Sequence, residues 1–303
     1  MKKIIVICGP TGIGKTTFAI ALAKTFNGEV VGADSMQIYK YMDIGTAKPS
    51  KEELDQARHH LVDCVDPRIE YDAGQYIKDA GAAIQDILSR KKLPIVAGGT
   101  GLYIRALLHG LFRSAPICEK IMEKLSSELE TDGARALHNR LKSCDPEAAF
   151  KIHPNDAFRV IRALEVFLAT GKKISDRQMQ HNFNANRYRA FKIGLSIDRQ
   201  ELYDRINQRV EIMVANGLLM EVKALLKKGY SFDLKPMKAI GYHHMALFIQ
   251  GDISWDEAIR LLKRDTRRYA KRQFTWFNKD KEIHWLHPDQ INKAKAWVKD
   301  FLT

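Results

Sequence analysis

The segment "GPTGIGKT" at Gly9–Thr16 contains the residues that are best placed to do chemistry. It follows the apolar run Lys3–Cys8 and opens a segment with helical apolar spacing, which is the context of a phosphate-binding loop. Glycines in such a loop let successive backbone N–H groups converge on phosphate oxygens, at the positive end of the following helix. We predict that Lys15 contacts the terminal phosphate and that Thr16 holds Mg²⁺. The predicted phosphate-binding residues are Gly9, Pro10, Thr11, Gly12, Ile13, Gly14, Lys15 and Thr16.

An ATPase or GTPase with this loop also needs a carboxylate at the end of a buried strand, where it holds Mg²⁺ or positions a water molecule. The buried strand expected at Leu93–Ala97 is instead followed by "GGTGLY" at Gly98–Tyr103. Thr100 and two glycines stand where the acid would be expected. The sequence therefore argues against a motor or switch protein and favours transfer of a group from the phosphorylated ligand.

Asp34 lies at the exit of the second expected strand, Glu29–Ser35. Parallel sheets bind their ligands at this edge, beside the phosphate-binding loop. Three roles fit the position: a general base, an indirect ligand of Mg²⁺ and an ordinary helix N-cap. Position alone does not choose among them.

Arg205 and Arg209 lie four residues apart in "RINQRV" and therefore share one face of an expected helix. Such a pair contacts an anionic ligand or forms a solvated charged face. Further along, the segment Arg260–Lys281 contains nine Lys or Arg residues against two Asp, with aromatic residues interleaved. Its basic stripe at helical spacing consists of Arg260, Arg264, Arg267 and Lys271. With the net charge of +13, this density favours a nucleic-acid surface over a purely solvated face.

The 303 residues indicate about two domains and contain no apolar run near the roughly 18 residues of a membrane span. The phosphate-binding loop begins so early that it leaves no room for a secretory signal. The four scattered cysteines then predict reduced thiols in a cytoplasmic protein. The adjacent pairs His59-His60 and His243-His244 point in different directions, so we expect structural or substrate-adjacent roles rather than metal ligation.

Expected strands alternate with helices in the first part of the chain, with strands at 3–8, 29–35 and 93–99 and helices at 15–26 and 73–92. This alternation predicts an α/β fold with a parallel sheet of the P-loop NTPase-like type. Expected helices then follow one another without a strand, at 118–131, 133–142, 146–151 and 155–170, and Gly171 ends the last of them. A strand at 189–198 and a capping box of Asp198 and Glu201 open a largely helical remainder.

These patterns predict an α/β core that is interrupted by an all-helical domain. Residues 1–112 form the first part of the core, and residues 113–189 form the helical insertion. Residues 190–303 complete the core with a basic helical C-terminal region.

Seven motifs follow one another over essentially the whole chain: "GPTGIGKT", "DSMQIYKYMDIGTAKP", "HHLVD", "GGTGLYIRALLHGL", "HPNDAFRVIRALEV", "AIGY" and "TRRYAKRQFTWF". In this order they resemble the bacterial tRNA dimethylallyltransferases, the IPP transferase family. The resemblance implies an enzyme that transfers a dimethylallyl group from dimethylallyl diphosphate to N6 of the adenosine 3′ to the anticodon of tRNA. It also implies Mg²⁺ as cofactor and an inserted domain that binds tRNA.

The resemblance further implies roles for single residues. Asp34 matches the family's general base, Thr100 matches a residue that orients the target nucleotide, and Lys15 and Arg209 match contacts to the diphosphate. Residues that match tRNA contacts are Asp34, Ser35, Met36, Gln37, Thr100, Met122, Phe158, Arg159, Val160, Ile161 and Arg162. Phe158 replaces a usual glutamine and favours stacking over hydrogen bonding, and Met122 replaces a common arginine.

The resemblance makes dimethylallyl diphosphate and the anticodon stem-loop of tRNA the expected partners of a monomeric enzyme. A P-loop nucleotide kinase is one rival, but it does not need a basic surface of RNA size. An ATP-switched RNA-binding protein is another, against which the missing carboxylate counts. A free adenine nucleotide as acceptor is a third, and the basic C-terminal helix favours a larger polyanion. Whether nucleotides compete for the phosphate-binding loop stays open.

Overall fold

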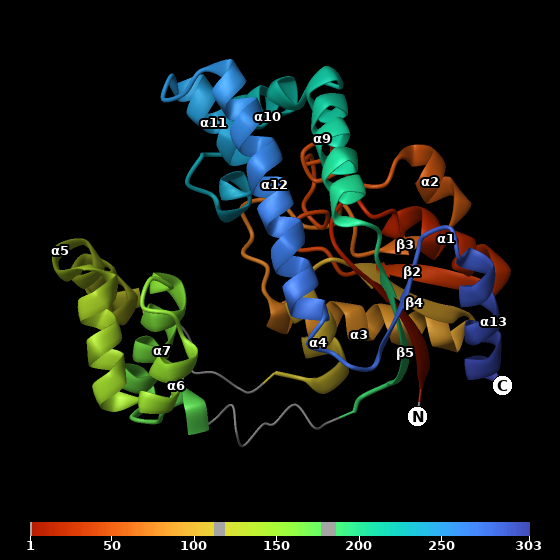
Figure 1. Ribbon diagram of the computed structural model, residues 1–303, viewed down its shortest axis with the longest axis horizontal. Helices are drawn as coiled ribbons and strands as arrows, with labels where there is room; N and C mark the ends of the chain where they lie inside the picture. The colour runs from red at the N-terminus through yellow and green to blue at the C-terminus, as the bar shows by residue number, and fades with distance from the viewer. Residues whose placement is uncertain (1, 112–118, 177–185) are drawn as a thin grey trace. The chain divides into compact units, whose positions relative to one another are not determined.

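The computed structural model describes residues 2–111, 119–176 and 186–303 (Figure 1). The chain divides into two compact units, one of Met1–Leu108 with Asn186–Thr303 and one of His109–Ala185. The second unit is therefore inserted into the sequence of the first. Each unit has its own hydrophobic core.

A six-stranded parallel sheet forms the centre of the first unit, in the order β3-β2-β4-β1-β5-β6. In this order β1 lies between β4 and β5, with Ile5 paired to Ile95 and to Phe191. The strands are β1 (Lys3–Cys8), β2 (Gly28–Gly32), β3 (His59–His60), β4 (Leu93–Gly98), β5 (Arg189–Leu195) and β6 (Ile283–Leu286). The predicted α/β class with a parallel sheet is confirmed.

Helices cover both faces of this sheet. α1 connects β1 to β2 across β4, and α3 connects β3 to β4 in the opposite direction, so right-handed connections place the two helices on opposite faces. The helices of this unit are α1 (Lys15–Thr25), α2 (Lys51–Gln56), α3 (Ala73–Ser89), α4 (Gly101–His109), α9 (Arg199–Ala215), α10 (Leu218–Lys227), α11 (Tyr242–Gln250), α12 (Trp255–Phe277) and α13 (Ile291–Leu302), with a 3₁₀ turn η1 at Lys235–Lys238.

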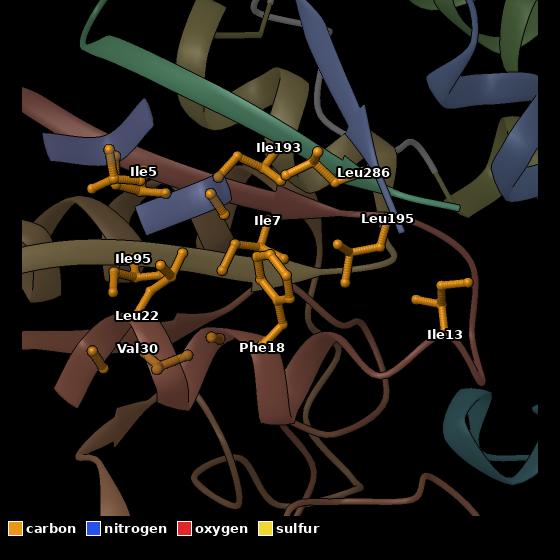
Figure 2. Packing of buried hydrophobic residues seen from close by; sticks show 14 of the residues in the cluster. Ile5, Ile7, Ile13, Phe18, Leu22, Val30, Ile95, Ile193, Leu195 and Leu286 are labelled. Atoms are coloured by element: carbon orange, nitrogen blue, oxygen red, sulfur yellow. The ribbon is translucent and has the colours of Figure 1, made fainter. Parts of the chain in front are cut away.

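The central strand β1 is buried on both faces. Ile5 and Ile7 point to the side of α1, where Phe18 and Leu22 pack against the sheet (Figure 2). Side chains alternate along a strand, so the neighbours of Ile5 and Ile7 point to the other face, and they are equally inaccessible to solvent. Burial on both faces explains why this strand reads as an unbroken apolar run.

The C-terminal helices of the first unit pack together. α12 contacts α9 and α11, and α10 also contacts α9 and α11 (Figure 1). Ser254 caps α12 by accepting a hydrogen bond from the amide of Glu257. Leu262, Ala270 and Phe277 are buried on one side of the helix. This packing aligns the long helix α12 with α9, and both carry side chains toward the phosphate-binding loop.

The second unit is a small helical bundle of α5 (Glu119–Cys144), α6 (Pro146–Lys151) and α7 (Ala157–Thr170). α5 breaks at Gly133, whose φ of 80° and ψ of 166° are not helical, so the two helices predicted around this residue both form. Asp156 caps α7, one residue after its predicted start, and Gly171 ends it at a φ of 65° as predicted. Leu125, Val160 and Leu164 lie in the core of the bundle.

Four elements of the first unit have no counterpart in the sequence prediction. β3 has two residues and β6 has four, too few for an apolar pattern to be distinguished from a loop. α2 is a six-residue helix with no buried residue, and α4 lies in a glycine-rich segment. The predicted capping box is half right. Asp198 accepts hydrogen bonds from the amides at the start of α9, but Glu201 forms an ion pair with Arg205 at 2.8 Å instead of returning to Asp198.

Cys8, Cys64 and Cys144 are free thiols, and Cys118 lies outside the described residues. Burial raises the pKa of the Cys8 thiol to about 12, so this residue is a neutral part of the core. Among the helices of the described ranges, none has the length and apolarity needed to cross a membrane.

Candidate active site

Gly12 and Gly14 shape the phosphate-binding loop. Their φ angles of 81° and 93° lie in the left-handed region that side chains with a Cβ avoid. Gly14 directly precedes α1, so the loop ends at the positive end of that helix. Within the loop, the Lys15 ammonium donates a hydrogen bond to the carbonyl oxygen of Pro10 at 2.7 Å. The loop therefore holds the conformation that its motif predicts.

Lys15 lies in an environment that disfavours its charge. Burial lowers the pKa of its ammonium group to about 8, the Asp34 carboxylate opposes this shift, and the Arg209 charge adds to it. A bound anion would stabilise the charged form and raise this pKa again. Lys15 is therefore suited to bind a negatively charged ligand.

A cavity of about 440 Å³ opens over the loop, and we call it the phosphate cavity. The loop residues Thr11 and Thr16 contribute hydroxyl groups to its wall. The positively charged residues of the wall are Lys15, Lys48, Arg205 and Arg209, and its acidic residues are Asp34 and Glu53. Lys48 is ion-paired with Asp43 and Asp63. Lys15, Arg209 and the loop amides are therefore the groups that suit a polyphosphate ligand.

Asp34 follows β2 by two residues and lines the phosphate cavity. Its Oδ1 accepts hydrogen bonds from the amides of Met36 at 2.8 Å and Gln37 at 3.3 Å. A turn and not a helix follows Asp34, so the helix N-cap role that the sequence allowed is not borne out. The two bonds form an Asx-type turn that fixes the orientation of the carboxylate. Of the hydrogen bonds among the described residues, none uses Oδ2. One oxygen holds the side chain in place and the other can accept a proton.

The glycine-rich segment after β4 packs against the strand exit that carries Asp34. A Cβ on Gly98 would lie 2.1 Å from the carbonyl oxygen of Ala33, so only glycine permits this approach. The Thr100 amide donates to that oxygen at 3.1 Å, and the Thr100 hydroxyl accepts from the Ser35 amide at 3.0 Å. This segment positions the acidic residue and supplies no carboxylate of its own.

Arg209 contacts two segments at the edge of the phosphate cavity. Its guanidinium donates at 3.5 Å to the Thr11 hydroxyl and at 3.5 Å to the carbonyl oxygen of Ala47. Burial lowers its pKa, and the Asp34 charge opposes this shift. Arg205 lines the same cavity but is ion-paired with Glu201. The two arginines predicted together therefore differ, because only Arg209 lies between the loop and its opposite wall.

A second cavity of about 330 Å³ shares part of its wall with the phosphate cavity, and we call it the apolar cavity. Residues common to both walls are Thr11, Asp34, Thr46, Ala47 and Arg209. The apolar residues that line this cavity and not the phosphate cavity are Met36, Ile206, Val210, Met213, Ala239, Ile240 and Leu262. Asp34 thus lies where a cationic cavity meets an apolar one.

α12 contributes residues to this region that the sequence analysis did not assign to the site. The buried Gln273 accepts a hydrogen bond from the Thr11 amide at 2.8 Å and donates one to the Gly99 carbonyl oxygen at 2.9 Å. Tyr269 and Arg272 line the apolar cavity. Burial raises the pKa of the Tyr269 phenol, whereas its hydrogen bonds with Thr100 and Gln273 act against the shift. The run of aromatic and basic residues was the available signal, but it was interpreted only as an RNA surface.

The predicted RNA-contacting segment 158–162 of the second unit is only partly accessible. Phe158 is 79% exposed, whereas Val160 and Ile161 are buried in the helical core. Helical spacing turns those two positions inward, so their side chains are not accessible for the predicted contact with tRNA. Arg159 and Arg162 form ion pairs with Asp156 and Glu165. Met122 packs against the same core.

Half of the predicted basic stripe on α12 is neutralised by ion pairs within the protein. Arg260 is paired with Glu257 and Arg264 with Asp265, whereas Arg267 donates to the neutral amide oxygen of Asn207 on α9. Lys271 and Arg272 are exposed, and the exposed Arg268 forms an ion pair with Asp265 at 3.6 Å. The cations of this helix that are available to a polyanion therefore lie in its C-terminal half, whereas the predicted stripe begins near its N-terminus.

Both histidine pairs have a member with a protein partner. His60 Nε2 lies 2.8 Å from the buried Glu29 carboxylate, and His244 Nε2 lies 3.2 Å from Asp265. Within residues 2–111, 119–176 and 186–303, no group of three or more His, Cys, Asp or Glu side chains is arranged to hold a metal ion.

Comparison with known proteins places this geometry in a family. The model of the family described as IPP transferase matches residues 37–280. A "tRNA dimethylallyltransferase" from Desulfosudis oleivorans is 49% identical over 301 residues, with 99% of this chain and 96% of the relative covered. A "tRNA dimethylallyltransferase 2" from Geotalea uraniireducens is 51% identical over 300 residues, with coverage of 99% and 97%.

Solved structures agree with the sequence relatives. A tRNA delta(2)-isopentenylpyrophosphate transferase from Staphylococcus epidermidis is 40% identical with a TM-score of 0.72 and covers 99% of each chain. A eukaryotic dimethylallyltransferase described as acting on tRNA is 32% identical with a TM-score of 0.81, covering 100% of this chain and 80% of that one. Since the family model spans most of the chain and the relatives align almost end to end, the chain belongs to the IPP transferase family.

Proposed function

We propose that this enzyme transfers a dimethylallyl group from dimethylallyl diphosphate to N6 of the adenosine 3′-adjacent to the anticodon of a tRNA, releasing diphosphate. The observation that carries the proposal is the position of Asp34 between a cationic cavity and an apolar one. An allylic diphosphate has these two halves, an anionic leaving group and an apolar chain. Family membership and the relatives' names support the same reaction.

The diphosphate of the donor binds the loop Gly9–Thr16 in this proposal. The loop amides, Lys15 and Arg209 stabilise the negative charge that grows on the leaving group as the C1–O bond of the allylic carbon breaks. The dimethylallyl chain extends past the shared wall into the apolar cavity, where Met213 and Leu262 provide apolar contact. This arrangement aligns C1 with the acceptor base.

Asp34 acts on the acceptor. The N6 amine forms a bond to C1, and one of its protons passes to the free carboxylate oxygen, so the product amine is neutral and the carboxylic acid later returns the proton to water. Thr100 is bonded to the segment that follows Asp34 and is proposed to orient the base. An adenine must leave its stack to reach a carboxylate in the wall of a cavity, which requires a flipped nucleotide.

Mg²⁺ fits the donor set of the phosphate cavity. Mg²⁺ usually binds through one or two protein oxygens together with ligand phosphates and waters. The Thr16 hydroxyl at the start of α1 offers the direct ligand, and the carboxylates of Asp34 and Glu53 line the same cavity. When bound there, the ion would neutralise charge on the leaving diphosphate.

The acceptor is proposed to be the anticodon stem-loop, bound by a monomeric cytoplasmic enzyme. The exposed Phe158 supports a stacking contact with an unpaired base, and Arg159 beside it supports a phosphate contact. The exposed cations Lys271 and Arg272 of α12 support a second basic surface.

A nucleotide kinase is the rival that the phosphate-binding loop alone would favour. The experiment that separates the two combines the protein, Mg²⁺, unmodified tRNA and dimethylallyl diphosphate labelled in its chain, without ATP. We expect label in the tRNA. Strict dependence on ATP, or label only in free AMP, would contradict the proposal.

A further inference from the structure

We propose that Glu221 of α10 is a positioning residue that holds the segment Asp43–Ala47 in the conformation needed for transfer. Thr46 and Ala47 belong to the walls of both cavities, so the place of this segment determines how the donor and acceptor meet. The inference rests on the proposed function, because it assigns a role at the same site. Glu221 itself is absent from both cavity walls and acts through the segment.

The Glu221 carboxylate receives four hydrogen bonds. Oε2 accepts from the amide of Asp43 at 2.9 Å and from that of Ile44 at 2.7 Å. Oε1 accepts from the amide of Gly45 at 3.1 Å and from the Tyr242 hydroxyl at 2.6 Å. Three successive amides that converge on one carboxylate form the kind of nest that binds anions, here filled by a side chain about 180 residues away in sequence.

Tyr242 closes the contact from the other side. It is 1% exposed, and a Cβ on Gly45 would lie 2.5 Å from its ring. The ring therefore packs directly on the backbone of Gly45, which requires glycine there. Burial raises the pKa of the Tyr242 phenol, and the Glu221 charge adds to the shift, so the hydroxyl remains a hydrogen-bond donor.

Ala47 is the strained end of the segment. Its φ of 48° lies in the left-handed region, which is unfavourable for a residue with a Cβ. Its carbonyl oxygen accepts from the Gln37 amide group at 2.8 Å and from Arg209 at 3.5 Å. Such a conformation persists only where the surroundings determine it strongly. Glu221 anchors the segment on one side, and Gln37 and Arg209 hold it on the other.

The contacts of Ala47 connect Glu221 to the reaction centre. If the segment shifts, the carbonyl of Ala47 leaves Arg209, and the wall between the two cavities moves away from Asp34. A displacement of about 1 Å of a positioning group can lower a rate by about 100-fold. The effect should appear at the reaction centre, whereas the RNA-binding surfaces stay intact.

Glu221→Gln tests the proposal with a side chain of the same shape. Glutamine keeps one oxygen for Asp43 and Ile44, but its amide group then faces the Gly45 N–H, which loses its acceptor. We expect faster hydrogen exchange at the Gly45 amide and a fall of about 10- to 100-fold in kcat/KM for dimethylallyl diphosphate. The dissociation constant for tRNA should not change. Glu211→Gln is the matched control, since Glu211 is exposed on α9 and forms its ion pair with Lys263 rather than with the segment Asp43–Ala47.

A second substitution tests the strain directly. Glycine at position 47 adopts positive φ without the Cβ penalty, so Ala47→Gly in the Glu221→Gln background should restore part of kcat/KM. The proposal would be overturned if Glu221→Gln had the kcat/KM of the wild type or an unchanged rate of hydrogen exchange at the Gly45 amide. It would also be overturned if the double variant recovered no kcat/KM.

A further variant is available should Glu221→Gln fail to fold. Tyr242→Phe removes one hydrogen bond to the same carboxylate, and unchanged exchange at the Gly45 amide in that variant would overturn the proposal. The exchange measurement needs no turnover, so it distinguishes failure of this inference from failure of the proposed reaction.

Discussion

The phosphate cavity and the apolar cavity share Asp34 but are built in different ways. The phosphate-binding groups of the first come mainly from one segment, Gly9–Thr16, whose backbone amides and Lys15 are neighbours in sequence. The second cavity is assembled from the exit of β2, the segment Gly45–Ala47, α9, the turn after η1, and α12. A local motif is enough to bind phosphate, because backbone groups do most of the work. An apolar pocket needs side chains from distant elements, so its shape depends on how those elements pack.

The largest expected effect comes from the group that the two cavities share. Asp34→Asn keeps an oxygen for the amides of Met36 and Gln37 but removes the base, so single-turnover transfer should fall by about 10²- to 10⁴-fold. Dissociation constants for dimethylallyl diphosphate and tRNA should stay close to those of the wild type. Normal transfer per bound tRNA in this variant would show that Asp34 is not the base.

The next effect compares two arginines that the sequence could not distinguish. Arg209→Ala removes a charged contact between the loop and the shared wall, so kcat/KM for the donor should fall by about 10- to 100-fold. Arg205→Ala should cost less, because Arg205 is already paired with Glu201 and lies outside the apolar cavity. Steady-state kinetics with both variants measures the difference. Equal losses would mean that the shared wall gives Arg209 no special role.

Gln273 tests whether α12 supports the phosphate-binding loop. Gln273→Leu leaves the Thr11 amide and the Gly99 carbonyl without their partner, so we expect the free energy of unfolding to fall by about 2–4 kcal/mol. KM for the donor should rise about tenfold as the loop relaxes, which is roughly one hydrogen bond of binding energy. Urea denaturation and steady-state kinetics measure the two effects. The exposed Gln200 provides the control Gln200→Leu, and a Gln273→Leu protein as stable as this control would contradict the assignment.

The smallest effect at neutral pH concerns the pH dependence of diphosphate binding, which involves the phosphate cavity alone. The free protein holds the pKa of Lys15 at about 8, and diphosphate binding favours the charged lysine, so affinity is lost as pH rises through 8. Relative to Lys15→Arg, which stays charged, the wild-type affinity for inorganic diphosphate should fall about tenfold for each pH unit above 8. Calorimetric titrations of both proteins from neutral to alkaline pH measure the ratio. A constant ratio across this range would contradict the shifted pKa.

The same contrast explains what could be predicted from the sequence. The strands β1, β2 and β4, the helix α1 after the loop and the helix end at Gly171 follow from local patterns, and the structure bears out these elements. Gln273 could not be placed, because its partner Thr11 is 262 residues away. Glu221 was missed for the same reason. Contacts between distant elements leave no periodic trace in the sequence.

Two predictions about RNA-facing residues are limited for a different physical reason. Val160 and Ile161 lie within a motif matched to tRNA contacts, but an amphipathic helix alternates between exposed and buried positions, so a continuous motif cannot be a continuous surface. The basic stripe on α12 was inferred from its cations alone, although Glu257 lies three residues before Arg260 and Asp265 is adjacent to Arg264, so the sequence already contained both acidic partners.

The most direct test of the central claim is a structure of the enzyme with a tRNA anticodon stem-loop and an unreactive thio analogue of dimethylallyl diphosphate. We predict the diphosphate on Gly9–Thr16, the dimethylallyl chain in the apolar cavity, and adenine N6 within hydrogen-bonding distance of Oδ2 of Asp34. A diphosphate bound elsewhere, or an adenine whose N6 faces away from Asp34, would contradict it.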